Sequence, residues 1–341
     1  MTPAVPRFAV IGGDVVADTL AGRHQDVLDV VRRAYLAHAA GRSVNPPSYF
    51  LRFPDRPEAR IIALPASLGD SFEVAGLKWI SSFPGNIEHD LPRASAVLVL
   101  NDLATGYPLA CLESSIISAT RTAASAVLAA GALHRTRARP RRVTYFGAGL
   151  IARYIADYFR RTGWTFDEVG VHDRSPDYAA QFSDTVRDTP AAPRVVTHAD
   201  AETAVRSSDL VVFATTAGTP HVHDVTWFSH APTVLHVSLR DLAPEIILDS
   251  VNVLDDVDHC LRAETSPHLA EQRTGSRDFV AGVLADVLTG RLVPPPDRTT
   301  IFSPFGLGIL DLAVGQFVYE TARRAGTLHE LPGFFHELSR Y

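Results

Sequence analysis

The chain has 341 residues, of which 46% are hydrophobic and 21% charged, and its formal net charge is −6. This composition excludes a disordered or collagen-like chain, and the length favours about two domains. A nucleic-acid partner would favour a basic surface, so we expect none. The two cysteines, Cys111 and Cys260, are too few for a disulfide framework and indicate a reducing compartment.

The sequence shows no segment that would place the protein in a membrane. Its longest hydrophobic runs, such as 94–100 and 123–133, are shorter than the ~20 residues of a membrane-spanning helix. Residues 1–10 lack the charged start and long apolar run of a secretory signal. We therefore expect a cytoplasmic protein with no membrane contact.

The first part of the chain predicts helices mixed with strands. Apolar residues at helical spacing predict a helix over 25–39, and short β-rich runs predict strands over 49–53, 60–64, 72–80 and 96–101. A glycine-containing loop, 102–106, predicts a hairpin that joins the strands 97–101 and 107–112. Residues 114–133, rich in Ala, Ser and Thr and free of proline, predict a long buried helix.

A basic segment follows, with five arginines among residues 135–142. It is a candidate phosphate-binding patch, but an exposed connector between two domains is the commoner case. Beyond it, apolar runs between helices predict the strands of a doubly wound parallel sheet, at 143–146, 168–172, 194–197, 210–214, 233–238 and 251–254. A last helix, 307–325, is expected to return to the first domain, because these strands already complete the parallel sheet.

The predicted fold class is therefore α/β. A Rossmann-type doubly wound parallel sheet is expected over 131–308. A second, α+β domain is expected over 1–130, completed by the C-terminal helix within 309–341.

Residues 143–152 have the pattern of a dinucleotide-binding turn, in which a strand leads through Gly147-Ala148-Gly149-Leu150-Ile151-Ala152 into a helix. Gly147 permits the tight turn, Gly149 lets the backbone approach a pyrophosphate, and Ala152 allows the helix to pack closely on the strand. The alternative is a glycine turn that binds no nucleotide.

The next predicted strand ends at Asp173. A carboxylate there would bind the adenosine ribose and repel a 2′-phosphate, which favours NAD over NADP. The neighbouring Arg174 could instead hold that phosphate. Thr215 and Thr216 follow a later strand, at the sheet edge that a cofactor crosses, although they could be simple turn residues.

The cofactor-binding residues that we predict are Gly147, Ala148, Gly149, Leu150, Ile151, Asp173, Arg174, Thr215, Thr216, Ser238 and Gly306. Four histidines lie close together in sequence, His221, His223, His230 and His236. Their spacing matches no zinc pattern, so we predict no metal site.

Lys78 is the single lysine among 32 basic residues. A codon bias toward arginine is the simplest explanation, yet lysine can lose its proton in a protein and arginine cannot. The strand pattern places Lys78 on a face with apolar neighbours, where an ammonium is costly unless it meets an anion. Lys78 is therefore a candidate site residue.

Arg121 lies inside the predicted helix 114–133, with no acidic residue within one helical turn. A buried guanidinium needs a carboxylate, which either a substrate or a distant Asp or Glu of the chain could supply. Arg52, near the end of the predicted strand 49–53, is a further candidate for binding a substrate carboxylate.

Several of these motifs resemble one protein family over nearly the whole chain. The motifs Gly76-Leu77-Lys78-Trp79, Asn101-Asp102, Arg121-Thr122-Ala123-Ala124, Gly147-Ala148-Gly149 and 302–311 are similar to those of the ornithine cyclodeaminase and mu-crystallin family. Segments 82–86, 238–242 and 303–306 most resemble its branch of N-(2-amino-2-carboxyethyl)-L-glutamate dehydrogenases, which supply L-2,3-diaminopropionate for siderophores.

The resemblance implies a homodimer in which the first domain, with the C-terminal helix, forms both the substrate pocket and the dimer contact. It also implies that Lys78 and Arg121 belong to the substrate site and that Asp241 is the catalytic aspartate. The chain departs from the cyclodeaminases at 61–65, where they carry a glutamate before a Met-Pro pair, and at 238–240, where they have a glycine-containing segment. The first departure argues against a cyclisation reaction.

The predicted function is NAD-dependent oxidative cleavage of N-(2-amino-2-carboxyethyl)-L-glutamate to 2-oxoglutarate and L-2,3-diaminopropionate, for siderophore or peptide-antibiotic biosynthesis. Arg121 would clamp a substrate carboxylate, Lys78 would lie near the reacting carbon, and Asp241 or Lys78 would activate water. One alternative is an ornithine or lysine cyclodeaminase that recycles its cofactor. The other is a mu-crystallin-like protein that only binds a small molecule.

Overall fold

The computed structural model describes residues 6–187 and 194–336, so the first half of the segment 1–10 lies outside the described residues. The chain divides into two compact units, one formed by Met1–Arg121 and Leu307–Tyr341, the other by Thr122–Gly306. The first boundary falls inside helix α3 (Ser115–Leu133), and the second comes just before helix α11 (Gly308–Ala325). The sequence instead places these boundaries at 130/131 and 308/309.

The first unit is built on a mixed sheet. Among the described residues its strand order is β16-β1-β7-β6-β5-β4-β2, with β3 pairing with β4. The strands are β1 (Ala9–Ile11), β2 (Ser43–Val44), β3 (Tyr49–Phe53), β4 (Arg56–Leu68), β5 (Val74–Ser82), β6 (Ala94–Asp102), β7 (Pro108–Glu113) and β16 (His329–Glu330). Strands β6 and β7 form the hairpin predicted from the sequence, and the 3-10 helix η1 (Pro84–His89) follows β5.

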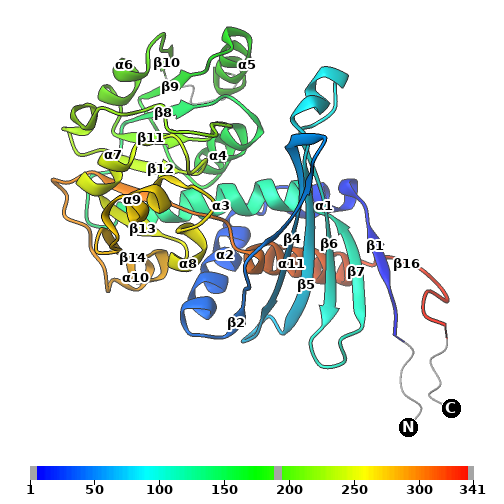
Figure 1. Ribbon diagram of the computed structural model, residues 1–341. Coiled ribbons are helices and arrows are strands. Elements are labelled where there is room, and N and C mark those ends of the chain that lie inside the picture. The colour runs from blue at the N-terminus through cyan, green and yellow to red at the C-terminus, as the bar shows by residue number, and fades with distance from the viewer. Residues whose placement is uncertain (1–5, 188–193, 337–341) are drawn as a thin grey trace. The chain divides into compact units, whose positions relative to one another are not determined.

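Helix α11 packs in the first unit against strands β4, β5 and β6, as the sequence predicts for the helix 307–325 (Figure 1). It also contacts helices α1 (Gly13–Leu20) and α2 (His24–Ala39). On β5, a Cβ at Gly76 would overlap the carbonyl oxygen of Val99 and lie 2.8 Å from Leu312 of α11. The absence of a side chain at Gly76 thus lets α11 lie directly over the strand that carries Lys78.

Helix α3 is the one helix in the described part of the chain whose length and hydropathy would suit a membrane span. Of its most apolar window, 67% is buried inside the protein, as in the core helix of a globular domain. The helix also contains Arg121, whose guanidinium is paired within the first unit.

The second unit is built on a fully parallel sheet with the strand order β10-β9-β8-β11-β12-β15-β13-β14 among the described residues. Its strands are β8 (Arg142–Phe146), β9 (Glu168–His172), β10 (Arg194–Thr197), β11 (Leu210–Phe213), β12 (Thr233–His236), β13 (Val251–Leu254), β14 (Val280–Val283) and β15 (Thr300–Ser303). The predicted Rossmann-type α/β fold is confirmed.

The prediction that six strands complete this sheet is wrong. Strand β15 lies between β12 and β13, and β14 forms an edge beyond β13. Both strands have only four residues. Gly282 interrupts β14, and Pro304 directly follows β15. Strands β10 to β13 are equally short and were predicted, so the difference lies in the glycine and proline, which break the apolar pattern of β14 and β15.

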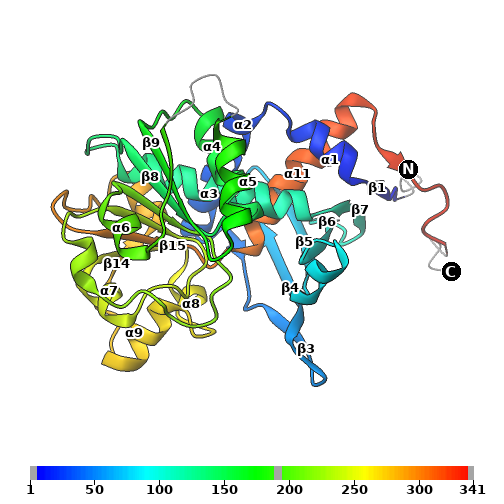
Figure 2. The same cartoon turned by 90° about the horizontal axis from the view of Figure 1, so that it is seen from above.

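Helices cover both faces of the parallel sheet. They are α4 (Leu150–Arg161), α5 (Pro176–Arg187), α6 (Ala201–Arg206), α7 (Pro244–Asp249), α8 (Val257–Cys260), α9 (Ser266–Thr274) and α10 (Leu284–Thr289), with the 3-10 helix η2 (Val225–Phe228). Helices α4 and α5 lie side by side (Figure 2), and Tyr145 of β8 contacts Phe182 of α5. From the other face, Phe146 and Phe213 join a core that includes Ile247 of α7. Burial on both faces explains the continuous apolar runs in the sequence.

Candidate active site

In the first unit, Lys78 of β5 is buried against Asp311 of α11. Its Nζ atom lies 2.7 Å from Oδ2 of Asp311 and donates a second hydrogen bond to Oγ of Ser118, 3.3 Å away. Lys78 is 2% exposed and Asp311 is fully buried. Asp311 is therefore the anion that a buried ammonium on this face requires.

Arg121 of α3 contacts the other oxygen of the same carboxylate, with its Nε atom 3.2 Å from Oδ1 of Asp311. Of the two interpretations of Arg121, pairing with a distant carboxylate of the chain is the one seen here. Two cations nevertheless share one carboxylate, so the buried cluster of Lys78, Arg121 and Asp311 has an excess of positive charge when all three groups are ionised. Such a cluster can attract the carboxylate of a ligand.

Burial lowers the pKa of Lys78 from 10.5 to about 8. The charge of Asp311 acts in the opposite direction, and the charge of Arg121 lowers the pKa further. Lys78 can therefore release its proton close to neutral pH, which no arginine in this position could do.

Asp311 is a site residue that the sequence analysis missed, since it noted this residue only within the 302–311 motif. A signal was present, because Asp311 stands alone among the apolar residues that open the helix 307–325. An acidic residue in an otherwise buried helical turn needs a partner, and the chain has two basic residues in similarly apolar segments.

Arg52 lies exposed on β3, directly opposite Arg60 of β4, with its guanidinium 5.3 Å from the centre of the Phe50 ring. The register pairs Arg60 with Ser82 of β5, which places Arg52 on the same face of the sheet as Lys78. Arg52 is two strands away from Lys78, and its role in substrate binding stays a prediction.

In the second unit, the glycine turn connects β8 to α4 as the sequence predicts. Gly147 has a φ of +86°, and a Cβ on it would lie 2.7 Å from the carbonyl oxygen of Ala214. A Cβ on Gly149 would meet nothing within 4 Å, so the space in front of this residue is open. Gly149 also caps α4 without a side-chain hydrogen bond, which leaves the helix N-terminus open to a phosphate.

The residues around the glycines differ in exposure. Ala148 is buried, Ile151 is partly buried, and the side chain of Leu150 is 50% exposed. A backbone turn with open space at Gly149 and an uncapped helix end fits the pyrophosphate of a dinucleotide.

Asp173 holds this turn in place, a role that the sequence did not predict. Its Oδ2 atom accepts a hydrogen bond of 2.7 Å from the backbone N–H of Ala148, and its Oδ1 atom one of 2.8 Å from Ser175. The carboxylate lies beside the glycine turn, as ribose binding requires. Arg174 is exposed at the surface.

At the carboxyl ends of β11 and β12, several polar side chains converge on Asp241. The hydroxyls of Thr215 and Ser238 donate hydrogen bonds to its two carboxylate oxygens. Nε2 of His221 lies 3.0 Å from Oδ1, and Nε2 of His236 lies 3.3 Å from Oδ2. The fold thus brings three predicted residues together with two histidines to which the sequence analysis gave no role.

Asp241 is fully buried. Burial by itself would raise the pKa of its carboxyl, but the hydrogen bonds from His221, His236 and Ser238 hold this pKa well below its usual range. Asp241 is therefore ionised at neutral pH, as a buried anion prepared to face a positive charge.

Thr216 is exposed beside this cluster, whereas Gly306 is buried. Gly306 has a φ of +93°, and its backbone N–H donates a hydrogen bond of 2.7 Å to Asp255, which also accepts one from Phe305. Burial raises the pKa of Asp255. Asp255 therefore fixes the 303–306 turn, a function for which the sequence carried no signal.

The parallel sheet, the glycine turn and the carboxylate that follows the second strand define an NAD-dependent oxidoreductase, as the sequence predicts. The model of the ornithine cyclodeaminase/mu-crystallin family matches residues 15–326, and the chain belongs to this family.

The chain is similar to several known proteins. It is 28% identical to N-((2S)-2-amino-2-carboxyethyl)-L-glutamate dehydrogenase of Staphylococcus aureus, over 89% of this chain and 92% of that protein. It resembles the crystal structure of CmnK with a TM-score of 0.84 and 29% identity, over 97% of this chain and 100% of that one. Its fold also matches Delta(1)-pyrroline-2-carboxylate reductase of Thermococcus litoralis, whose structure was solved in complex with NADH and L-proline. The TM-score is 0.85 and the identity 23%, over 95% of this chain and 100% of that one.

We expect Asp173 to set the preference for NADH over NADPH. Asp173→Asn keeps a hydrogen-bond acceptor for the glycine turn but removes the charge that repels a 2′-phosphate. The ratio of the NADH affinity to the NADPH affinity should therefore fall by about tenfold. Asp173→Ala should also weaken NADH binding, because it releases the backbone of Ala148. Fluorescence titrations with both nucleotides measure these affinities. Equal affinities in the unmodified protein would contradict the prediction and indicate that Arg174 controls the choice.

Proposed function

We propose that this protein is an N-(2-amino-2-carboxyethyl)-L-glutamate dehydrogenase, which supplies L-2,3-diaminopropionate for siderophore or peptide-antibiotic biosynthesis in the cytoplasm. Its broader class is established: it is an NAD-dependent amino-acid dehydrogenase that acts on a CH–NH bond. The finer proposal rests on the buried cluster of Lys78, Arg121 and Asp311, whose excess positive charge suits a substrate with three carboxylates. It is supported by the 28% identity to the Staphylococcus aureus dehydrogenase.

Arg121 and Lys78 bind the substrate in this proposal. Asp311 accepts the hydrogen bond from Nε of Arg121. The two Nη groups of the guanidinium are then left to bind the two oxygens of the glutamyl α-carboxylate. The ion pair with Asp311 also fixes the direction of the guanidinium before the substrate arrives. Lys78, held by Asp311 and Ser118, lies near the reacting carbon.

When bound, NAD+ supplies the acceptor for the hydride that leaves the glutamyl α-carbon. The substrate then carries a protonated imine at its bridging nitrogen. The ionised carboxylate of Asp241 stabilises the positive charge of this imine. Lys78 accepts a proton from the water that adds to the imine carbon. Asp241 is poorly suited to that step, because its strongly lowered pKa makes it a weak base. Cleavage of the carbon–nitrogen bond releases 2-oxoglutarate and L-2,3-diaminopropionate.

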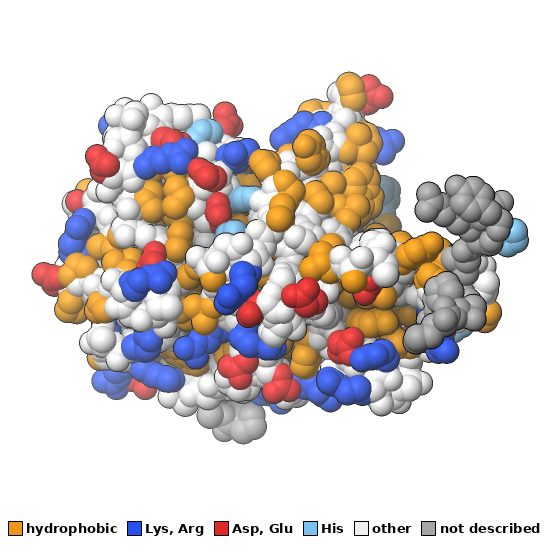
Figure 3. All heavy atoms as spheres, turned by 90° about the horizontal axis from the view of Figure 1, so that it is seen from below, with side chains coloured by type: hydrophobic (Ala, Val, Ile, Leu, Met, Phe, Trp, Pro, Cys, Tyr) orange, Lys and Arg blue, Asp and Glu red, His pale blue; other side chains and the backbone are white. Residues whose placement is uncertain are grey.

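We also propose a homodimer formed through the sheet of the first unit. Tyr49, Leu51, Trp79 and Val97 are between 39% and 70% exposed, and the register places them on the face opposite Lys78. Figure 3 shows hydrophobic side chains gathered on the projecting β3–β4 hairpin. A second copy would cover these side chains, and size-exclusion chromatography with light scattering measures the resulting mass.

The reaction is tested by incubating the protein with NAD+ and N-(2-amino-2-carboxyethyl)-L-glutamate. We expect one NADH for each 2-oxoglutarate and each L-2,3-diaminopropionate, because the cofactor leaves in its reduced form. Mass spectrometry identifies the products, and L-ornithine should yield no proline. Proline formed without accumulation of NADH would establish a cyclodeaminase instead. Binding of NAD+ with no turnover of either substrate would favour a mu-crystallin-like binding protein.

A further inference from the structure

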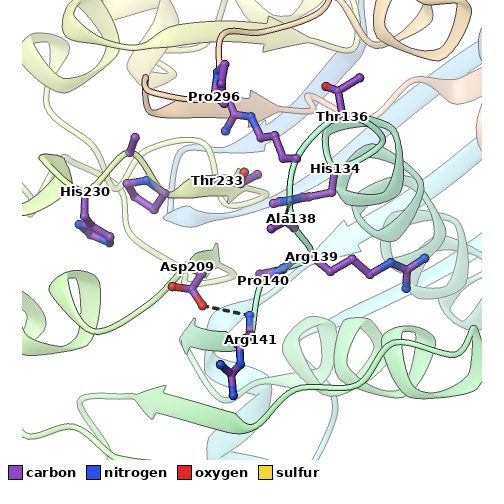
Figure 4. A pocket seen from close by; sticks show the side chains of 13 residues that line it. His134, Thr136, Ala138, Arg139, Pro140, Arg141, Asp209, His230, Thr233 and Pro296 are labelled. Carbon is purple, nitrogen blue, oxygen red and sulfur yellow. Dashed lines mark hydrogen bonds between the residues drawn. The ribbon is translucent and has the colours of Figure 1, made fainter.

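The arginines of this chain differ in how the fold compensates their charge. The basic segment 135–142 borders a cavity in the second unit, and each of its arginines has a partner within the fold (Figure 4). The partners are carbonyl oxygens for Arg135 and Arg137, the Trp164 ring for Arg139, and the carboxylates of Asp167 and Asp209 for Arg141 and Arg142. These contacts argue against the phosphate-binding patch that the sequence left open.

Arg93, in the first unit, is half-buried and lacks such compensation. It lies just before β6, and among the described residues its side chain makes one hydrogen bond, from Nη1 to Oγ of Ser82, 2.8 Å away. Its donors at Nε and Nη2 have no partner there, and no carboxylate in the described part of the chain pairs with the guanidinium. Because a half-buried cation without an anion costs folding free energy, Arg93 calls for an anion from outside the fold.

The position of Arg93 is fixed by the loop that contains η1. Its carbonyl oxygen accepts a hydrogen bond of 2.8 Å from the backbone N–H of Phe83, and the carbonyl oxygen of Pro92 accepts one of 3.1 Å from the side chain of Asn86. Ser82, which accepts the hydrogen bond from the guanidinium, is 6% exposed. Arg93 itself is partly exposed, so a ligand can reach its remaining donors. A side chain held in this way loses little conformational entropy on binding.

The contact with Ser82 brings the guanidinium of Arg93 to the face of the sheet that carries Lys78. Ser82 and Lys78 both belong to β5 and are four residues apart, so their side chains lie on the same face and their Cα atoms are ~13 Å apart. Glu88 and Asp90, the acidic residues of the loop between β5 and β6, are exposed and form no ion pair with Arg93. The positive charge of Arg93 is therefore available on the substrate face.

The separation of Arg93 from Lys78 suits a ligand with two carboxylates on a short chain. In an extended glutamyl group the α- and γ-carboxylates are ~5 Å apart, and a hydrogen bond at each end adds about 3 Å. A substrate whose α-carboxylate is held by Arg121 can therefore extend its γ-carboxylate along β5 toward Arg93. Contacts on both sides of the α-carbon fix this reacting carbon more firmly than one contact would.

We infer that Arg93 binds the γ-carboxylate of the glutamyl half of the substrate, and that Ser82 orients its guanidinium for this contact. The inference rests on the proposed function for the identity of the substrate. Arg93 then determines specificity, because an amino acid with a neutral side chain would leave this guanidinium without an anion. The enzyme is thus expected to select substrates that carry a second carboxylate on the reacting half.

The test measures binding to the full-length protein saturated with NADH, without an amine, so that no reaction proceeds. Calorimetry compares 2-oxoglutarate, the proposed product that carries the γ-carboxylate, with 2-oxopentanoate, which has a methyl group in its place. We expect the unmodified protein to bind 2-oxoglutarate at least about tenfold more tightly. Arg93→Gln should abolish this difference by weakening the binding of 2-oxoglutarate alone, and Arg93→Lys, which keeps the charge, should restore part of it. Arg323→Gln, which removes an exposed, ion-paired arginine of α11, should leave both affinities unchanged.

In turnover of N-(2-amino-2-carboxyethyl)-L-glutamate, Arg93→Gln should raise KM more than it lowers kcat. The inference is overturned if the unmodified protein binds the two oxoacids equally, or if Arg93→Gln weakens both alike, as the loss of a structural contact would. It is also overturned if Arg93→Gln raises KM but keeps the preference for 2-oxoglutarate, because Arg93 would then bind the diaminopropionyl carboxylate. A preference that depends on Arg93 in a protein that does not turn over the substrate would refute the proposed function and support the carboxylate site.

Discussion

Lys78→Arg is expected to lower the turnover number on the order of 10²-fold or more. The variant keeps the positive charge, but a guanidinium cannot accept the proton of the attacking water. It is also larger than the ammonium, which is 2% exposed and enclosed by Asp311 and Ser118. The initial rate of NADH formation with N-(2-amino-2-carboxyethyl)-L-glutamate measures the effect, and NADH binding should be unchanged.

Arg121→Lys serves as the matched comparison for this variant, since it changes the other cation that contacts Asp311. We expect it to raise KM more than it lowers kcat, because in the proposed mechanism Arg121 binds the substrate and takes no proton. Near-normal turnover in Lys78→Arg would show that Lys78 acts only as a diffuse positive charge.

The pH profile provides an independent check on Lys78. Its pKa is about 8, so the neutral amine that can accept a proton becomes the major form only above that pH. We therefore expect kcat to rise as the pH increases through about 8 and then to level off. A kcat that falls over the same interval would mean that the ammonium, not the amine, is the active form.

Asp241→Asn is expected to lower kcat on the order of 10²-fold to 10³-fold, comparable to the loss of a preorganised electrostatic group in other active sites. The asparagine has nearly the same shape and still offers one acceptor oxygen, but it removes the buried negative charge. A change limited to kcat, with the affinity for NADH preserved, would identify Asp241 as the group that stabilises the cationic imine.

The control for Asp241 is Thr215→Val, which removes one donor from the carboxylate but leaves its charge. We expect a smaller loss of kcat in this variant. Thermal melting of both variants separates a loss of folding from a loss of catalysis. If Asp241→Asn retains normal kcat, Asp241 only holds Thr215, Ser238 and the two histidines together.

The sequence by itself determined the parallel sheet and its glycine turn. The predicted strands 168–172 and 251–254 coincide with β9 and β13, and Gly147 occupies the positive-φ position that the motif requires. These features could be predicted because they depend on local patterns: an apolar run buried on both faces, or a backbone angle that only glycine adopts freely. The family and the NAD cofactor followed from the same local motifs.

Only the tertiary structure decided which groups meet in the candidate site. Lys78 and Asp311 are 233 positions apart in the chain, and Arg121 and Asp311 are 190 positions apart. Their contact depends on how closely α11 packs over β5, where Gly76 has no side chain. His221 and His236 likewise contact Asp241 because the carboxyl ends of the neighbouring parallel strands β11 and β12 lie together. The partner of a buried charge is set by packing between distant segments, and local periodicity contains no information on that pairing.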